Sequence, residues 1–318
     1  MSTTIEFLGK RMDNNPLVSI IVPNYNHACY LDRRLDTVFN QSYKNFEVII
    51  LDDCSTDNSL EIINKYKNNI HLSQVIVNES NTGSTFYQWE KGIQLSKGDL
   101  IWIAESDDYN ELTFLEEMVK GIVLDDRIVV AFSSYVFFND FGGVNRHKDR
   151  FNLSFDGIRF IRGWMNMQCA IKNASGAVFK KEAYRLISKE FVSYRGAGDY
   201  QFWTEIASKG RVMYIRKNLT FCRVGSNSVT ANNKKTGNGL VEDMRVCNFI
   251  LQNYNLSWFQ KQAMNAMFSF KYRQHTSIPE DVLIKMNELW QFDKRKEGID
   301  LLYLRFIGFL RRYFGILI

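Results

Sequence analysis

The chain has 318 residues, 45% of them hydrophobic, with only 3 prolines, so it can form one large domain or two small ones and is not disordered or fibrous. Its net charge of +5 suits anionic partners such as nucleotides, phospholipid or nucleic acid, without choosing among them. The 5 cysteines are odd in number and form no C-x-x-C pair, which argues against a disulfide framework or a structural zinc site, and the N-terminus lacks a signal-peptide pattern.

The first half of the chain alternates predicted strands and helices. Apolar β-branched runs end at turn-forming residues, and apolar residues at helical spacing follow each of them. This order predicts a parallel, doubly wound α/β sheet. The expected strands are 18–22, 46–51, 74–77 and 100–104, and the expected helices are 31–39, 60–66, 84–96 and 112–122.

The strand expected at 100–104 ends at an acidic turn with Glu105, Asp107 and Asp108. Carboxylates this close repel one another, so a bound cation would stabilise them. Ligands of open α/β sheets also bind at the carboxyl ends of strands. A solvated acidic turn before a helix is the alternative interpretation, and the spacing alone does not decide between the two.

No glycine-rich phosphate loop occurs in the chain. The absence of G-x-G-x-x-G after the first strand and of G-x-x-x-x-G-K-[ST] anywhere disfavours a dinucleotide-dependent oxidoreductase and a P-loop NTPase. A phosphate site among these acids would work through a metal ion rather than a glycine nest.

Three motifs resemble those of the family 2 glycosyltransferases: residues 18–26, residues 46–57 and the strand that ends at 105–108. The resemblance implies the GT-A fold, a mostly parallel sheet with helices on both faces. It also implies inverting transfer of a sugar from a nucleotide diphosphate-sugar, with Mg²⁺ or Mn²⁺ as cofactor.

The resemblance assigns nucleotide-binding roles to Pro23, Tyr25, Asp53, Glu105 and Ser106. Tyr25 matches the aromatic residue that stacks on the base, although a rim tyrosine packed on a loop is the alternative. Asp53 matches the acceptor for the imide N–H of uracil, which favours a UDP-sugar, or a dTDP-sugar, over a cytosine nucleotide. Glu105 stands where the family commonly has the first aspartate of a D-x-D element.

Asp107 matches the metal-binding aspartate of that element, where the ion bridges both phosphates and improves the leaving group. Asp108 is expected either as a second ligand or as the cap of the following helix. Asp199 matches the family's catalytic base, which takes the proton of the acceptor hydroxyl. A helix cap is the alternative role for Asp199, because an aspartate at a helix start is a common cap.

Two departures from the family pattern occur. Gly225 stands where many relatives have the histidine of Arg-x-His, and Arg223 before it could contact phosphate or form a structural salt bridge. Many relatives also have Arg-Asn before the glycine of the helix expected at 84–96, where Lys91 is the cation available here.

The predicted organisation is a tail over 1–15, a GT-A domain over 16–235 and a helical C-terminal extension over 236–318. Within the domain, 16–125 is the expected nucleotide-binding half and 126–235 the expected acceptor half. The last stretch, 298–318, is apolar with three arginines, so it predicts either an amphipathic helix at the inner face of the plasma membrane or a core helix.

Together these features predict a cytoplasmic, metal-dependent inverting glycosyltransferase of surface-polysaccharide biosynthesis. The sequence leaves open whether the protein also attaches to the surface of a membrane. The expected acceptor is a saccharide or a lipid-linked saccharide, and no nucleic-acid partner is expected. A nucleotidyltransferase is the competing enzyme, and the missing phosphate loop counts against it. A catalytically degenerate scaffold subunit that binds nucleotide-sugar is the alternative outside enzymes.

Overall fold

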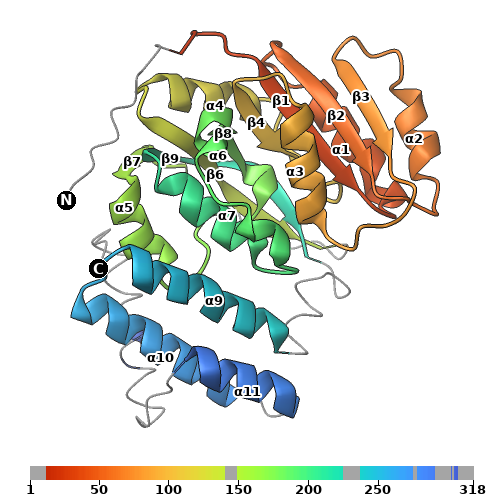
Figure 1. The fold of residues 1–318 in the computed structure, drawn as a ribbon. Coiled ribbons are helices and arrows are strands. Elements are labelled where there is room, and N and C mark those ends of the chain that lie inside the picture. The colour runs from red at the N-terminus through yellow and green to blue at the C-terminus, as the bar shows by residue number, and fades with distance from the viewer. Residues whose placement is uncertain are drawn as a thin grey trace. The chain divides into compact units, whose positions relative to one another are not determined.

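The computed structural model describes residues 12–139, 149–224, 237–274, 278–290, 302 and 304–306. Most of the predicted tail lies outside these residues. The chain divides into two compact units (Figure 1). The first comprises Met1–Phe155, Ile171–Ile187 and Lys209–Val224, and the second comprises Asp156–Ala170, Ser188–Ser208 and Gly225–Ile318.

The described part of the first unit contains a nine-stranded sheet in the order β3-β2-β1-β4-β8-β6-β9-β5, with β7 paired to β9. Its strands are β1 (Val18–Asn24), β2 (Phe46–Asp52), β3 (Leu72–Val77), β4 (Leu100–Ile103), β5 (Tyr109–Asn110), β6 (Ile128–Phe138), β7 (Leu153–Asp156), β8 (Ala177–Lys180) and β9 (Arg211–Arg223). Its helices include α1 (Ala28–Phe39), α2 (Ser59–Lys65), α3 (Thr85–Leu95), α4 (Phe114–Val123) and α6 (Lys181–Arg185).

Strands β3, β2, β1 and β4 are mutually parallel. Strand β8 runs antiparallel between β4 and β6, and β6 and β9 are again parallel. The sheet is therefore mixed but mostly parallel, as the resemblance implies. The predicted helix at 112–122 begins two residues later, at Phe114, and Leu112 before it is exposed.

Helices cover both faces of this sheet. Val18, Ile20 and Val22 of β1 belong to one buried cluster together with the apolar face of α1. Ile21 points to the opposite face and meets α3, where a methyl group at Gly92 would come closer to its Cγ2 than real Cβ atoms approach. The alternation along β1 therefore explains why α1 and α3 lie on opposite sides.

The described part of the second unit is helical. It contains α5 (Gly157–Phe160), the π-turn Ile161–Met165, the 3₁₀ turn Glu190–Ser193, α7 (Gly198–Ala207), α9 (Asn238–Asn253), α10 (Trp258–Gln274) and α11 (Glu280–Leu289). Phe202, Trp203 and Ile206 of α7 are fully buried. Helices α9 to α11 confirm the predicted helical C-terminal extension.

Most of the stretch 298–318 falls outside the described residues, so its predicted membrane contact stays a prediction. Among the helices that can be described, none has the length and apolar content of a membrane span. The expected acceptor half, 126–235, is shared between the two units, and the division at residue 125 likewise stays a prediction.

Candidate active site

Strands β2, β1 and β4 are adjacent and parallel, so their carboxyl ends meet at one edge of the sheet. The chain order reverses between β1 and β4, which makes this edge the switch point where open α/β sheets bind ligands. Tyr25, Asp53 and the turn at 105–108 follow these three strands directly. The topology therefore brings the predicted nucleotide and metal residues of the first unit together.

The end of β1 presents an exposed aromatic ring. Tyr25 is 44% exposed, although it follows a fully buried strand. Asn24 before it donates a hydrogen bond to Asp52 Oδ2 over 2.7 Å, which ties the ends of β1 and β2 together. Pro23 is buried within β1 and paired with Leu51, and its predicted nucleotide contact stays a prediction.

Asp53 is buried, and its carboxylate accepts five hydrogen bonds from three residues. Asn78 Nδ2 and Gln88 Nε2 donate to Oδ1 over 2.7 and 2.9 Å. Thr82 donates its amide to both oxygens, over 3.1 and 3.0 Å, and its hydroxyl to Oδ2 over 2.8 Å. Asp53 therefore holds the loop after β3 and the start of α3. The imide N–H of a nucleotide base would have to share the Asp53 carboxylate with these donors or replace one of them.

A pocket of about 470 Å³ opens beside this loop, lined in part by Asn78, Gln88 and Lys91. Lys91 Nζ donates to Asn78 Oδ1 over 2.6 Å. Lys91, the cation anticipated from the sequence, is therefore hydrogen-bonded to Asn78, which in turn donates to Asp53.

Glu105 is half-buried at the end of β4. Its Oε1 accepts hydrogen bonds from Trp89 Nε1 over 2.7 Å and from Thr85 Oγ1 over 3.3 Å, both on α3. Burial and the neighbouring Asp107 raise the pKa of Glu105 to about 8. The side chain is therefore largely protonated at neutral pH unless a cation stands beside it.

Asp108 is buried, and both of its oxygens accept hydrogen bonds. Ser175 Oγ donates to Oδ2 over 2.7 Å, and the Arg223 amide donates to Oδ1 over 3.0 Å. Burial, with a contribution from Asp107, raises the pKa of Asp108 to about 6. Burial also raises the pKa of Asp107, against the opposing charges of Arg34 and Arg223.

Arg34 of α1 lies fully buried beneath this turn. Its Nε donates to the Glu105 carbonyl over 2.8 Å, and its Nη1 donates to Asn110 Oδ1 over 2.7 Å. Burial lowers the pKa of Arg34, while the acids of the turn oppose that change. The guanidinium thus balances part of the buried negative charge.

The hydroxyl of Ser106 lies 2.7 Å from Nδ1 of His27, the residue that precedes α1. Burial lowers the pKa of His27, so its neutral form is favoured. Gly225, the position of the missing family histidine, lies outside the described residues. A histidine nevertheless reaches this turn, and it comes from the loop after β1.

The donor set suits Mg²⁺ or Mn²⁺ bound together with a ligand. The pKa values of three crowded carboxyl groups are raised because burial disfavours their ionised forms, and a divalent cation beside them would favour ionisation. Over residues 12–139, 149–224 and 237–274, and in the short described pieces beyond, no three acidic, histidine or cysteine side chains form a complete metal site. With Asp108 engaged by protein donors, Asp107 fits an ion that takes its remaining ligands from phosphates and water.

Asp199 belongs to the second unit and lies in the first turn of α7. Its Oδ1 accepts a hydrogen bond from the Tyr200 amide over 2.7 Å. Ala197, at the N-cap position, offers no side-chain cap. Asp199 is therefore a half-buried residue of the first helical turn, two positions after the N-cap residue, and its role as base stays a prediction.

Several partners of the site were not anticipated from the sequence, namely His27, Arg34, Asn78, Thr82 and Gln88. Arg34 had a usable signal, because helical spacing places it on the same face as Leu31 and Val38. A charged residue on an apolar face implies a buried partner. The others are ordinary polar residues in loops or turns or near helix starts, where no pattern separates them from solvated ones.

The family model described as "Glycosyl transferase family 2" matches residues 19–187. The Escherichia coli enzyme UDP-Glc:alpha-D-GlcNAc-diphosphoundecaprenol beta-1,3-glucosyltransferase WfaP is 29% identical over 225 residues, which are 69% of this chain and 82% of that protein. The structure of S. aureus TarS 1-349 in complex with UDP-GlcNAc superposes with a TM-score of 0.64 at 18% identity, covering 92% of this chain and 83% of that one.

A second solved structure is similar in fold. The mannosyltransferase PcManGT from Pyrobaculum calidifontis, in complex with GDP-Man and Mn²⁺, has a TM-score of 0.57 at 14% identity, covering 95% of this chain and 88% of that one. At these identities the two structures support the predicted fold and nothing beyond it.

Proposed function

Because the chain belongs to glycosyl transferase family 2, we propose that it transfers a sugar from a UDP-sugar, with inversion, to a saccharide or lipid-linked saccharide acceptor in surface-polysaccharide biosynthesis. One observation supports the donor site most directly. The exposed ring of Tyr25, the carboxylate of Asp53 and the acidic turn at 105–108 converge at one switch-point edge of the sheet.

In this proposal the base stacks on Tyr25, and Asp53 accepts its imide N–H in place of one of its present donors. Glu105 and Ser106 lie on the ribose and diphosphate side. A cytosine ring has an acceptor at the imide position, so it would face the Asp53 carboxylate without a proton. A dTDP-sugar fits the same reasoning, whereas the GDP-Man complex of a fold neighbour shows that the fold alone does not select the base.

Asp107 would hold Mg²⁺ or Mn²⁺ together with diphosphate oxygens, with Asp108 behind it anchoring the turn. The bound ion supplies neutralisation of the charge on the departing nucleotide. The buried Arg34 guanidinium limits how much negative charge the turn carries when no ligand is present.

Asp199 is the proposed base for the acceptor hydroxyl. A carboxylate can take that proton as the hydroxyl attacks opposite the leaving nucleotide, which inverts the sugar carbon. The lipid-linked acceptor is inferred from the activity that the name of the WfaP relative states, and peripheral membrane contact from the composition of 298–318.

Calorimetric titration with UDP, dTDP, GDP and CDP, each with Mn²⁺ and with EDTA, tests the donor site. Metal-dependent binding of UDP or dTDP, but not of GDP or CDP, is expected. Transfer is then measured from UDP-glucose and UDP-GlcNAc to a synthetic GlcNAc-diphospho-lipid. Asp199→Asn should lower the transfer rate by about 10²- to 10⁴-fold and leave UDP affinity unchanged. Nucleotide binding without transfer to any acceptor would instead favour the scaffold alternative.

A further inference from the structure

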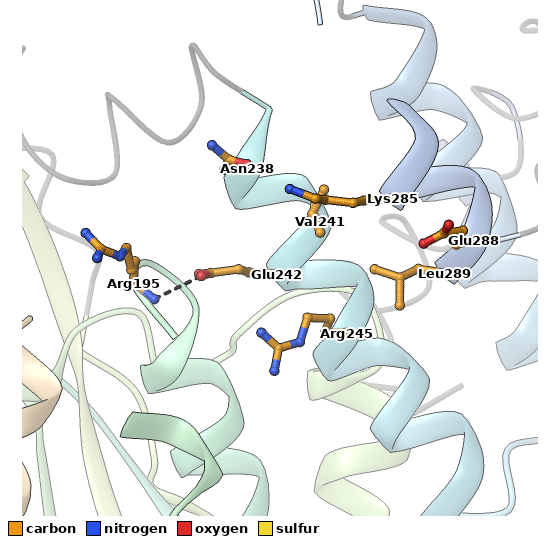
Figure 2. Close-up of a pocket in the computed structure, with 8 residues that line it drawn as sticks. All are labelled: Arg195, Asn238, Val241, Glu242, Arg245, Lys285, Glu288 and Leu289. Atoms are coloured by element: carbon orange, nitrogen blue, oxygen red, sulfur yellow. Dashed lines mark hydrogen bonds between the residues drawn. The ribbon is translucent and has the colours of Figure 1, made fainter. Parts of the chain in front are cut away.

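The loop that leads into α7 is tied to α9 by one carboxylate. Glu242 accepts hydrogen bonds from three consecutive amides: Oε1 from Arg195 over 2.9 Å, and Oε2 from Gly196 over 2.7 Å and from Ala197 over 2.8 Å. Figure 2 shows Glu242 reaching from α9 toward the amide of Arg195 at the edge of a pocket of about 530 Å³.

These three bonds hold the loop that ends at Ala197, the N-cap residue of α7, and not the first amides of the helix itself. Ala197 has no side chain able to accept from the first helical amides, and Gly196 before it has no side chain at all. Three successive N–H groups that converge on a carboxylate form a nest, and bonds to an ionised acceptor are stronger than neutral ones. Glu242 therefore fixes the path of the chain two residues before Asp199.

Helix α9 is a firm support for this contact. Its buried residues Met244, Cys247 and Ile250 pack within the second unit, and Cys247 Sγ lies 3.5 Å from the hydroxyl of Tyr200, the residue after Asp199. The Tyr200 hydroxyl also donates to the Met165 carbonyl. The first turn of α7 is thus held from both sides of Asp199.

We propose that Glu242 is a positioning residue for Asp199: it sets the direction in which α7 begins and hence where the Asp199 carboxylate lies. This inference rests on the proposed role of Asp199 as base. A base must lie within hydrogen-bond reach of the proton that it removes, so a small shift of the first helical turn lowers the rate of proton removal. Glu242 itself touches no substrate in this scheme.

The test compares Glu242→Gln with Glu288→Gln. The glutamine keeps the length of Glu242 but turns one acceptor oxygen into an NH₂ group that faces amide donors. Glu288 lines the same pocket from α11 and is exposed, so its substitution removes an equal charge without touching the loop. The assay is UDP release from UDP-GlcNAc or UDP-glucose with Mn²⁺ and the synthetic GlcNAc-diphospho-lipid as acceptor, together with calorimetric UDP affinity.

Glu242→Gln should lower kcat by about 10- to 100-fold, with KM for the donor and UDP affinity within about twofold of the wild type. Glu288→Gln should keep the wild-type kcat. In the Asp199→Asn background, Glu242→Gln should change the residual rate by less than about twofold, because the two residues act through one group. A wild-type kcat in Glu242→Gln, or an equal loss in Glu288→Gln, would overturn the proposal.

Hydrogen exchange separates a local effect from loss of folding. In Glu242→Gln the amides of 195–197 should lose protection while those of the α7 interior keep it. Glu242→Asp retains the charge but not the reach, and should fall between the wild type and Glu242→Gln in kcat. If Asp199→Asn is fully active, the base assignment and this proposal both fail. If Asp199→Asn is inactive and both Glu242 variants are fully active, the positioning role alone fails.

Discussion

Glu105→Gln should make the ligand-free protein more stable at neutral and alkaline pH. Glutamine has nearly the same shape as glutamate, and its Oε1 can still accept the hydrogen bond from Trp89 Nε1. It has no proton to lose, however. The substitution therefore removes the charge that burial and Asp107 disfavour in the wild type.

The sign follows from the raised pKa of Glu105. This pKa is about 8 in the folded protein against an ordinary value of 4.5, so the folded state keeps a proton that the unfolded chain has released. The stability contributed by this proton is complete below pH 4.5 and is lost as the pH rises toward 8. At about 1.4 kcal/mol per pH unit, the loss by pH 7 is at most about 3 kcal/mol, and solvent screening of the half-buried side chain lowers it to about 1–3 kcal/mol.

Thermal unfolding in EDTA between pH 5 and pH 8 measures this effect, with Glu61→Gln on the exposed side of α2 as the control. The Tm of Glu105→Gln should exceed that of the wild type by roughly 2–6 °C at pH 7, and the difference should shrink toward pH 5. A Tm difference that is the same at pH 5 and pH 8, or a less stable variant at pH 8, would refute the reasoning.

Three further changes have defined outcomes. Asp107→Ala should weaken UDP binding at least about 10-fold with Mn²⁺ and leave it unchanged in EDTA, measured by calorimetry, and equal losses in both would contradict a metal role. Tyr25→Ala should weaken UDP binding by about 1–3 kcal/mol with or without metal, whereas an unchanged affinity would make Tyr25 a packing residue only. Gly92→Ala should cost about 1–3 kcal/mol of unfolding free energy, because the new methyl would lie well under 3.0 Å from Ile21 Cγ2. Gly121→Ala should cost less, because its methyl would come no closer than 3.0 Å to a neighbour. Equal denaturation midpoints for the two variants would contradict the packing argument.

The strands and helices of the nucleotide side followed from periodicity, because β1, β2 and β4 are buried on both faces and read as continuous apolar runs. Strand β9, Arg211–Arg223, is harder to recognise from the sequence over its full length. Polar residues 216–218 interrupt its apolar pattern, and its register against β6 shifts at the same place. Strand β6 itself was not anticipated, although its eleven residues are mostly buried.

In the candidate site, the charged residues that stand in a motif could be predicted from the sequence. The residues that hydrogen-bond to them could not. Asp53 and the acidic turn stand at strand ends that the sequence reveals. Thr82 and Ser175 reach these acids only because loops distant in sequence fold beside them. The role of Glu242 was likewise invisible, since an acid on a helix with no special spacing reads as a solvated residue.

Helix α3 connects the two ends of the candidate donor site. Gln88 donates to Asp53, while Trp89 and Thr85 donate to Glu105, and one turn later Gly92 lets the helix lie directly against β1. A change in the seating of α3 therefore reaches the base side and the phosphate side at once. Attempts to engineer a new nucleotide preference through this helix should alter affinity for the diphosphate as well, whereas substitution of the exposed Tyr25 ring itself should act on the base.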